Sequence, residues 1–148
     1  IRDALGGSVA DKKIAVLGLA FKANTDDVRD SPALTIVPVL QREGANVTVY
    51  DPVAADNARQ VLGSVRIEYA DSLKQAIADA DAVVILTEWE EFRNLDWGAL
   101  AGAMARPLVI DLRNLYSLAQ AAAMDVEYIS LGRNPVGGDH GGNGGARR

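Results

Sequence analysis

The feature that most constrains the fold of this chain is a regular alternation between short apolar runs and amphipathic segments. Short apolar runs bounded by turn residues are typical of strands that are buried on both faces of a sheet. We expect six such strands, at residues 13–20, 45–50, 66–69, 82–87, 108–111 and 126–131. Helices are expected between them, at residues 31–44, 54–62, 71–80, 96–105 and 117–124.

This order of elements predicts an α/β fold with a doubly wound, mostly parallel six-stranded Rossmann-like sheet in three layers. A helix between consecutive strands lets them run parallel, and right-handed connections place helices on both faces. Residues 11–133 are expected to form this domain, and residues 1–10 to be the end of a preceding linker or helix. Residues 134–148 are predicted to be a disordered tail, because they are rich in glycine and have almost nothing apolar to bury.

The composition excludes several classes of site and partner. The chain has no cysteine, so it contains no disulfide, thiolate metal site or cysteine nucleophile. Its one histidine, His140, lies in the glycine-rich tail, and we expect no metal site. A net charge of −5 argues against a nucleic-acid-binding face, although it leaves room for a local phosphate site. No membrane partner is expected, since no apolar stretch approaches the roughly 20 residues of a span, and without a secretory signal we expect a cytoplasmic location.

The first turn of the sheet resembles a dinucleotide-binding turn but lacks its glycines. That turn needs Gly-x-Gly-x-x-Gly, so that the backbone can approach a pyrophosphate at a helix N-terminus. Here Gly18 is followed by LAFKA, and the next helix begins only near residue 31. Asp51, at the end of the second strand, is followed by proline, which favours a turn or helix start over a ribose ligand. The sequence therefore predicts a Rossmann shape without the usual way of holding NAD.

A longer first loop, residues 21–30 (FKANTDDVRD), takes the place of that turn. It follows the carboxyl end of the first strand, where open α/β sheets bind ligands. Lys22 can reach a phosphate or a sugar hydroxyl, and Arg29 can grip an anion with two parallel hydrogen bonds. The alternative is that both cations pair with the aspartates of the loop and stiffen it. Both roles can hold at once.

A second candidate segment, residues 111–114 (DLRN), follows the fifth strand and carries Arg113. Its alternative interpretation is strand-end capping with a surface arginine. Trp89 and Phe92 could stack on a base, but aromatic residues after a strand more often fill a core or an interface. The nearby glutamates, Glu88, Glu90 and Glu91, are interpreted as a solvated helix start and not as an acid/base set.

At these residues the chain resembles a known family. Residues 18–32 (GLAFKANTDDVRDSP) resemble the signature that opens the C-terminal, UDP-binding domain of the UDP-glucose/GDP-mannose dehydrogenase family. The segments YDP, LTEW and DLRN recur at the expected places, and the likeness covers about residues 1–133. Residues 24–27, 87–93 and 111–116 look most like the bacterial UDP-glucose members, while the UDP-N-acetylhexosamine and GDP-mannose members share much of the pattern.

The resemblance implies a function that this chain only partly carries. In the family, the full enzyme oxidises C6 of UDP-glucose twice with two NAD molecules to give UDP-glucuronate. An N-terminal domain holds most of the NAD, a central helical region forms a homodimer or a larger assembly, and the C-terminal domain closes over the nucleotide sugar. By this resemblance Phe21, Lys22 and Arg113 contact the UDP-sugar, and Arg29 reaches across to the NAD.

The catalytic residues of the family, a cysteine above all, lie upstream of this domain. The chain is therefore expected to contain no catalytic residue and to be inactive alone, because the second oxidation needs a covalent nucleophile. Two other readings stay open. One is a free-standing nucleotide-binding module, and the other is an interaction domain of flavodoxin-like shape that binds no nucleotide.

Overall fold

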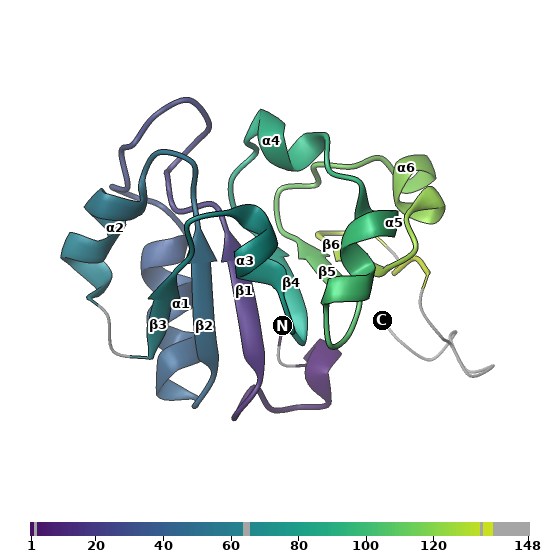
Figure 1. Ribbon diagram of the computed structural model, residues 1–148, viewed down its shortest axis with the longest axis horizontal. Coiled ribbons are helices and arrows are strands. Elements are labelled where there is room, and N and C mark those ends of the chain that lie inside the picture. Colours follow the sequence, from purple (N-terminus) through teal and green to yellow (C-terminus); the bar gives the residue numbers. More distant parts are fainter. Residues whose placement is uncertain (2, 64–65, 134, 138–148) are drawn as a thin grey trace.

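The computed structural model describes residues 1, 3–63, 66–133 and 135–137 and contains a six-stranded sheet whose strand pairs are all parallel (Figure 1). The strand order is β3-β2-β1-β4-β5-β6. The strands are β1 (Lys13–Leu17), β2 (Asn46–Tyr50), β3 (Ile67–Tyr69), β4 (Ala82–Ile85), β5 (Leu108–Asp111) and β6 (Glu127–Ser130). The direction of winding reverses between β1 and β4, so the predicted doubly wound fold is confirmed.

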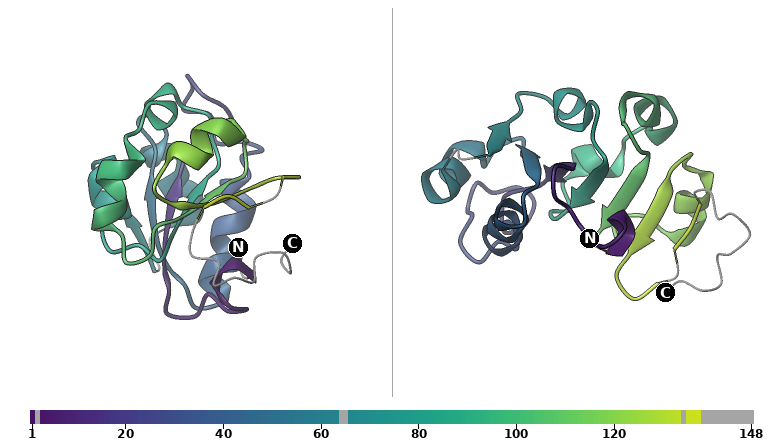
Figure 2. Two further views of the ribbon diagram at one scale, coloured as in Figure 1. Left: turned by 90° about the vertical axis from the view of Figure 1, so that its right-hand side faces the viewer. Right: turned by 90° about the horizontal axis from the view of Figure 1, so that it is seen from below.

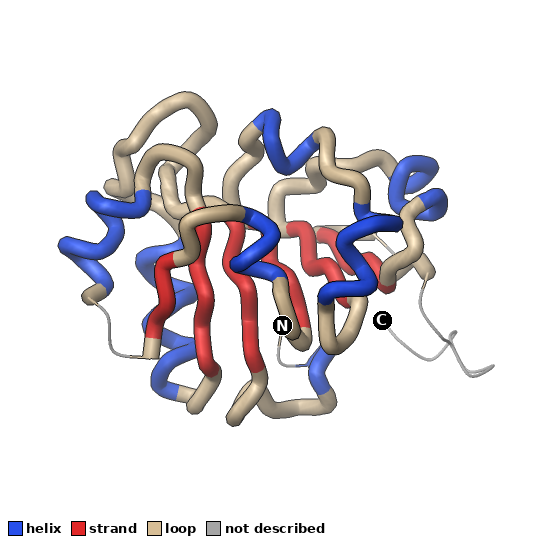
Figure 3. The backbone as a smooth tube through the Cα atoms, in the orientation of Figure 1, coloured by secondary structure: helices blue, strands red, loops and turns tan. Residues whose placement is uncertain are grey.

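Helices cover both faces of the sheet and make the outer layers (Figure 2). Helix α1 lies behind the strands in the view of Figure 1, and α3 and α5 lie in front of them (Figures 1 and 3). The α-helices are α1 (Ala33–Arg42), α2 (Ala55–Leu62), α3 (Leu73–Ile77), α4 (Glu90–Arg93), α5 (Trp97–Leu100) and α6 (Leu118–Ala123). Two 3₁₀ turns, η1 (Asp3–Leu5) and η2 (Ala101–Ala103), complete the described elements.

Three of the six described α-helices, α3, α5 and α6, begin at a residue whose side chain accepts a hydrogen bond from the first turn. The Ser72 hydroxyl accepts a hydrogen bond from the N–H of Gln75 at 3.1 Å and begins α3. Ser117 and Gln120 form a reciprocal capping box at α6. Helix α1 begins at Ala33, two residues after the predicted start at residue 31, although Pro32 already has helical φ and ψ.

The structure shortens several of the predicted elements. Strand β1 ends before Gly18, whose φ of +104° is unsuited to a strand. Helix α3 ends at Ile77 and not near residue 80, and Asp79 has a φ of +60°. The glutamates interpreted as a solvated helix start do lie at a helix start, since Glu90 and Glu91 are exposed in the first turn of the short helix α4.

The packed unit is longer at both ends than the predicted residues 11–133. Leu5 and Val9 are buried in the core, so part of the segment before residue 11 packs with the domain. At the other end, Val136 exchanges two backbone hydrogen bonds with Tyr128 of β6, which corrects the tail boundary at residue 134. The remainder of the predicted disordered tail, residues 138–148, lies outside the described residues.

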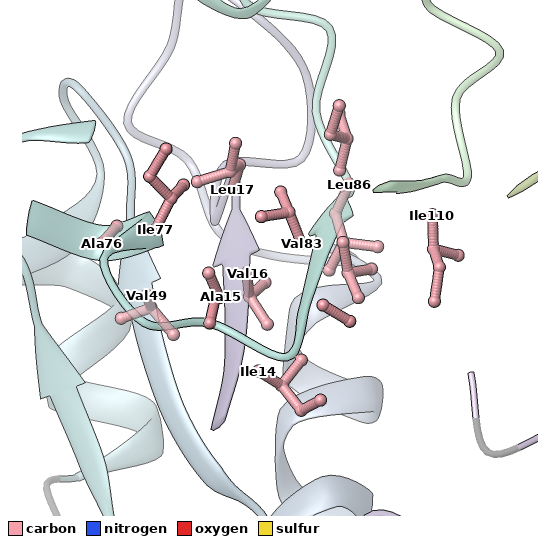
Figure 4. Close-up of a cluster of buried hydrophobic side chains, with 14 of the residues drawn as sticks. Ile14, Ala15, Val16, Leu17, Val49, Ala76, Ile77, Val83, Leu86 and Ile110 are labelled. Carbon is pink, nitrogen blue, oxygen red and sulfur yellow. The ribbon is translucent and has the colours of Figure 1, made fainter. Parts of the chain in front are cut away.

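Side chains of the central strands pack into one continuous hydrophobic core (Figure 4). All four residues of β4 and of β5 are buried, as expected for strands covered on both faces. The edge strand β6 instead alternates between half-buried and buried residues. Within the described part of the chain, no helix is long and apolar enough to cross a bilayer.

A buried carboxylate at the end of β2 ties three segments together. The Asp51 side chain is 5% exposed, and each donor lies 2.8 to 3.0 Å from one of its oxygens. The five donors are the backbone N–H groups of Leu19, Ala20, Val53 and Ala54 and the indole N–H of Trp89. The carboxylate therefore fixes the chain after β1, the start of the segment leading to α2, and the segment after β4. This geometry agrees with the structural role predicted for Asp51.

We expect Asp51→Asn to lower the free energy of unfolding by about 3 kcal/mol, because the amide presents an NH₂ group to buried donors and removes the charge they stabilise. Urea denaturation of the purified chain measures this. The control is Asp56→Asn, an exposed carboxylate in the first turn of α2, for which we expect a change within about 0.5 kcal/mol. Equal effects of the two substitutions would contradict the role assigned to Asp51.

Candidate functional site

The candidate residues lie in loops at the carboxyl ends of the strands, the upper edge of the sheet in Figure 1. The change of winding direction between β1 and β4 makes this edge the expected ligand site of the fold. Three connections meet there: β1 to α1, β4 to α4, and β5 to α6.

The first turn packs closely against the segment that follows β4. A Cβ atom on Gly18 would lie 2.5 Å from Oγ1 and 2.7 Å from the backbone nitrogen of Thr87. The Thr87 side chain is fully buried, and its hydroxyl donates to the carbonyl of Ala20 at 2.8 Å. Thr87 therefore fills the space beside the first turn.

The backbone donors of the first turn are also occupied. The N–H groups of Leu19 and Ala20 donate to Asp51, and the N–H of Phe21 donates to the carbonyl of Asp27 at 2.7 Å. A pyrophosphate needs such groups to be unpaired. The backbone N–H groups of the β1–α1 turn are thus already engaged within the domain.

The loop at residues 21–30 is braced, yet it presents its first two residues outward. Val28 is buried, the side-chain amide of Asn57 donates to the Asp26 carbonyl at 2.9 Å, and Thr25 Oγ1 accepts from the N–H of Asp27 at 3.1 Å. Phe21 is 43% exposed, and Lys22 is exposed. Among the residues that the structure describes, none pairs with the Lys22 ammonium.

Arg29 differs from Lys22, because it already has an anionic partner within its own loop. Its Nε and Nη2 donate to the two carboxylate oxygens of Asp27 at 3.0 and 2.8 Å, and its backbone N–H donates to the same carboxylate at 2.9 Å. The side-chain hydrogen bond from Arg29 lowers the pKa of Asp27 from 3.8 to about 2. The bracing role predicted as an alternative is therefore present for Arg29.

Arg113 is anchored at its backbone and at its guanidinium. Its N–H donates to Oδ1 of Asp111 at 3.0 Å, and Asp111 is fully buried at the end of β5. Its Nη2 lies 2.7 Å from Oε1 of Glu88. The predicted capping role of Asp111 is confirmed, but Arg113 is not an unconstrained surface arginine, because Glu88 holds it from another loop.

The aromatic residues after β4 fill the core. Trp89 is 7% exposed, and its indole N–H donates a hydrogen bond to Asp51. Phe92 is fully buried, and its ring centroid lies 6.2 Å from that of Tyr50. Neither ring offers an exposed face for a base, so the packing interpretation holds.

Lys22 and Arg113 follow strands whose carboxyl ends lie at the same edge of the sheet, and Arg29 lies farther along the Lys22 loop, beside α2. Lys22 follows β1 and Arg113 follows β5, with β4 between those strands. Arg29 instead lines a hollow of about 550 Å³ between its loop and α2, with Asn57 and Gln60. No group of three potential metal ligands is found among the described side chains.

Sequence reasoning missed the partnership of Glu88 with Arg113. The two residues are far apart in the chain, and the glutamate was taken to belong to a solvated helix start. The signal that was available is topological, because residues that follow adjacent strands β4 and β5 meet at one edge.

Comparison with known proteins identifies the domain. The model for the UDP-glucose/GDP-mannose dehydrogenase family, UDP binding domain, matches residues 15–118. The chain belongs to the UDP-glucose/GDP-mannose dehydrogenase family. The matched range includes the 21–30 loop and Arg113, so every predicted site residue lies within the UDP-binding domain of this family.

Relatives within the dehydrogenase family agree with this assignment. A UDP-glucose 6-dehydrogenase from Rhizobium meliloti (strain 1021) is 49% identical over 130 residues, which cover 88% of this chain and 29% of that protein. Among solved structures, a UDP-glucose dehydrogenase from Pyrobaculum islandicum is 31% identical with a TM-score of 0.70, over 86% of this chain and 27% of that one. A UDP-D-ManNAc dehydrogenase from Pyrococcus horikoshii is 30% identical with a TM-score of 0.71, over 89% and 28%. This chain thus spans about three tenths of the length of its relatives.

We expect Gly18→Ala to destabilise the domain by about 2–4 kcal/mol, because the added methyl group meets the Thr87 backbone and the residue keeps a positive φ. Urea denaturation gives the value. Gly102→Ala is the matched control, since nothing lies within 4 Å of its Cβ position, and it should change stability by no more than about 0.5 kcal/mol. A wild-type stability for Gly18→Ala would contradict the close approach of Gly18 to Thr87.

The Asp27–Arg29 pair predicts an acid-shifted titration. In the unmodified chain Asp27 should titrate near pH 2, and the ion pair should persist until the pH falls to that value. Arg29→Ala should raise the pKa toward 3.8 but not fully, because the backbone N–H of residue 29 still donates to the carboxylate. Carboxyl-carbon NMR measures both values, with Arg42→Ala, at the end of α1, as a control that leaves the Asp27 pKa unchanged.

Proposed function

We propose that this chain is the UDP-sugar-binding domain of an NAD-dependent UDP-glucose 6-dehydrogenase. The observation that carries the proposal is the membership of residues 15–118 in the UDP-binding domain family, with an exposed lysine and a held arginine on one rim of that domain. The relative at 49% identity is a UDP-glucose enzyme, which favours UDP-glucose over an N-acetylated sugar.

Lys22 and Arg113 supply the positive charge that a nucleoside diphosphate requires. A diphosphate carries adjacent negative charges, and an ammonium and a guanidinium approaching from separate loops can compensate them without burying either cation. Phe21, adjacent to Lys22, adds 43%-exposed apolar surface for the rest of the ligand. We assign Phe21, Lys22 and Arg113 to the UDP-sugar on this basis.

The NAD is proposed to be held mainly by an N-terminal domain of the same enzyme. The occupied N–H groups after β1 and the Thr87 side chain beside Gly18 do not fit a dinucleotide in this domain. NAD accepts the hydride when it is bound in the full enzyme. Arg29 is the residue assigned to reach the NAD, from an exposed position on the loop.

The domain contributes binding and orientation of the substrate, and the covalent chemistry belongs elsewhere in the enzyme. With no cysteine in the sequence, a thiol nucleophile must come from outside this chain. Closure of two domains over one substrate, in a homodimer or a larger assembly, would place the sugar between the nucleophile and the NAD.

We expect the purified chain to bind UDP, and Lys22→Ala and Arg113→Ala each to weaken binding by about tenfold to a hundredfold, the loss of one charge-assisted hydrogen bond. Isothermal titration calorimetry measures the dissociation constants, and thermal melts check folding. Arg29→Ala is the matched control and should leave UDP affinity unchanged. Titrations with uridine and GDP test whether the diphosphate and the uracil are recognised. Wild-type affinity in both Lys22→Ala and Arg113→Ala would refute the site assignment.

We expect no dehydrogenase activity from the chain alone. NADH absorbance at saturating UDP-glucose and NAD should not rise above that of a heat-inactivated sample, because no nucleophile is present. Sustained turnover would show that the chemistry does not depend on an upstream domain.

A further inference from the structure

Glu88 has a carboxylate oxygen that depends on a single cation. Oε1 of Glu88 is inaccessible to solvent and makes no hydrogen bond with a described residue. Its charged neighbour is Nη2 of Arg113, at an ion-pair distance of 2.7 Å. A buried anionic oxygen without a hydrogen bond is costly, so the guanidinium is what compensates it.

This ion pair is not required to hold the two loops in place. The chain on either side of Glu88 is fixed by the buried Thr87 hydroxyl and by the Trp89 indole, each through its own hydrogen bond. The backbone of Arg113 is fixed by Asp111. What the pair adds is a defined direction for the Arg113 side chain.

The pair also leaves most of the guanidinium donors available. A guanidinium has five N–H donors, and Glu88 approaches only the Nη2 end. No other described residue binds the Arg113 side chain, which is 32% exposed. Arg29 differs, because Asp27 occupies both its Nε and its Nη2. Arg113 is thus held at one end and open at the other.

We propose that Glu88 is a positioning residue that orients Arg113 so that its unused N–H groups meet the diphosphate of the nucleotide. This inference rests on the proposed function of Arg113. Holding the side chain before binding removes the entropic cost of ordering it when the nucleotide arrives. Glu88 does not itself touch the ligand.

The charge of Glu88 makes the test decisive, because two explanations predict opposite signs. If Glu88 were only a negative charge near an anion site, then Glu88→Ala would strengthen UDP binding. If Glu88 orients Arg113, Glu88→Ala should weaken UDP binding by about threefold to tenfold, the cost of immobilising one long side chain. Glu88→Gln removes the charge but keeps a side chain of the same size with an oxygen dipole beside the guanidinium, and should lose less than Glu88→Ala.

The experiment is a double-mutant cycle on UDP binding by the chain, measured by calorimetry with thermal melts alongside. In an Arg113→Ala background, the effect of Glu88→Ala should vanish, because there is no guanidinium left to orient. Glu90→Ala, which removes the exposed carboxylate near Arg93, is the control and should not change UDP affinity.

The failure of this inference is distinguishable from failure of the proposed function. Tighter or unchanged UDP binding in Glu88→Ala, or an equal loss in the Arg113→Ala background, would overturn the positioning role while the wild-type affinity upholds UDP binding. Absence of UDP binding by the wild-type chain would refute the proposed function, and this inference with it.

Discussion

The Asp51 carboxylate is the interaction on which the ligand edge of this domain depends. Five N–H donors from three segments converge on its two oxygens, which is why a charge can be buried there at all. In a dinucleotide-binding fold, the same backbone N–H groups and the same acidic position serve the ligand. Here the backbone N–H groups bind the Asp51 carboxylate, which leaves the side chains of the loops as the groups at this edge that could meet a ligand.

Asp111 repeats the arrangement on the other half of the sheet. Its Oδ2 accepts from the N–H of Leu115 at 2.6 Å and from the hydroxyl of Tyr128 at 2.5 Å, while Oδ1 accepts from Arg113. Burial is the main cause that raises the pKa of Tyr128, and its hydrogen bond to Asp111 adds to it. The loops that carry Lys22 and Arg113 are thus fixed by two buried aspartates. Asp51 follows β2 and Asp111 ends β5, on either side of the central strands β1 and β4.

The sequence was sufficient for what is decided locally. The alternation of apolar and amphipathic segments predicted the strands and the helices between them, and the proline after Asp51 indicated a structural aspartate. The lengths of the strands were harder to predict from the sequence. Strand β1 ends at Gly18, which lies close to Thr87, and such a contact between distant segments leaves no local pattern. The same reason hid the Glu88–Arg113 pair, since only the folded sheet brings the ends of β4 and β5 together. Lys22 was found from its place after a strand, and its role stays a prediction.

The pairing of Val136 with Tyr128 bears on how this domain meets other chains. An open parallel sheet exposes unpaired backbone groups along its outer strands, and such edges invite association with any extended segment. At β6, the N–H and C=O of Tyr128 are already bonded to Val136. At the opposite edge, β3 is only three residues long, too short to form a template for another strand. The pairing of Tyr128 and the short length of β3 thus limit strand addition at the two edges of the sheet.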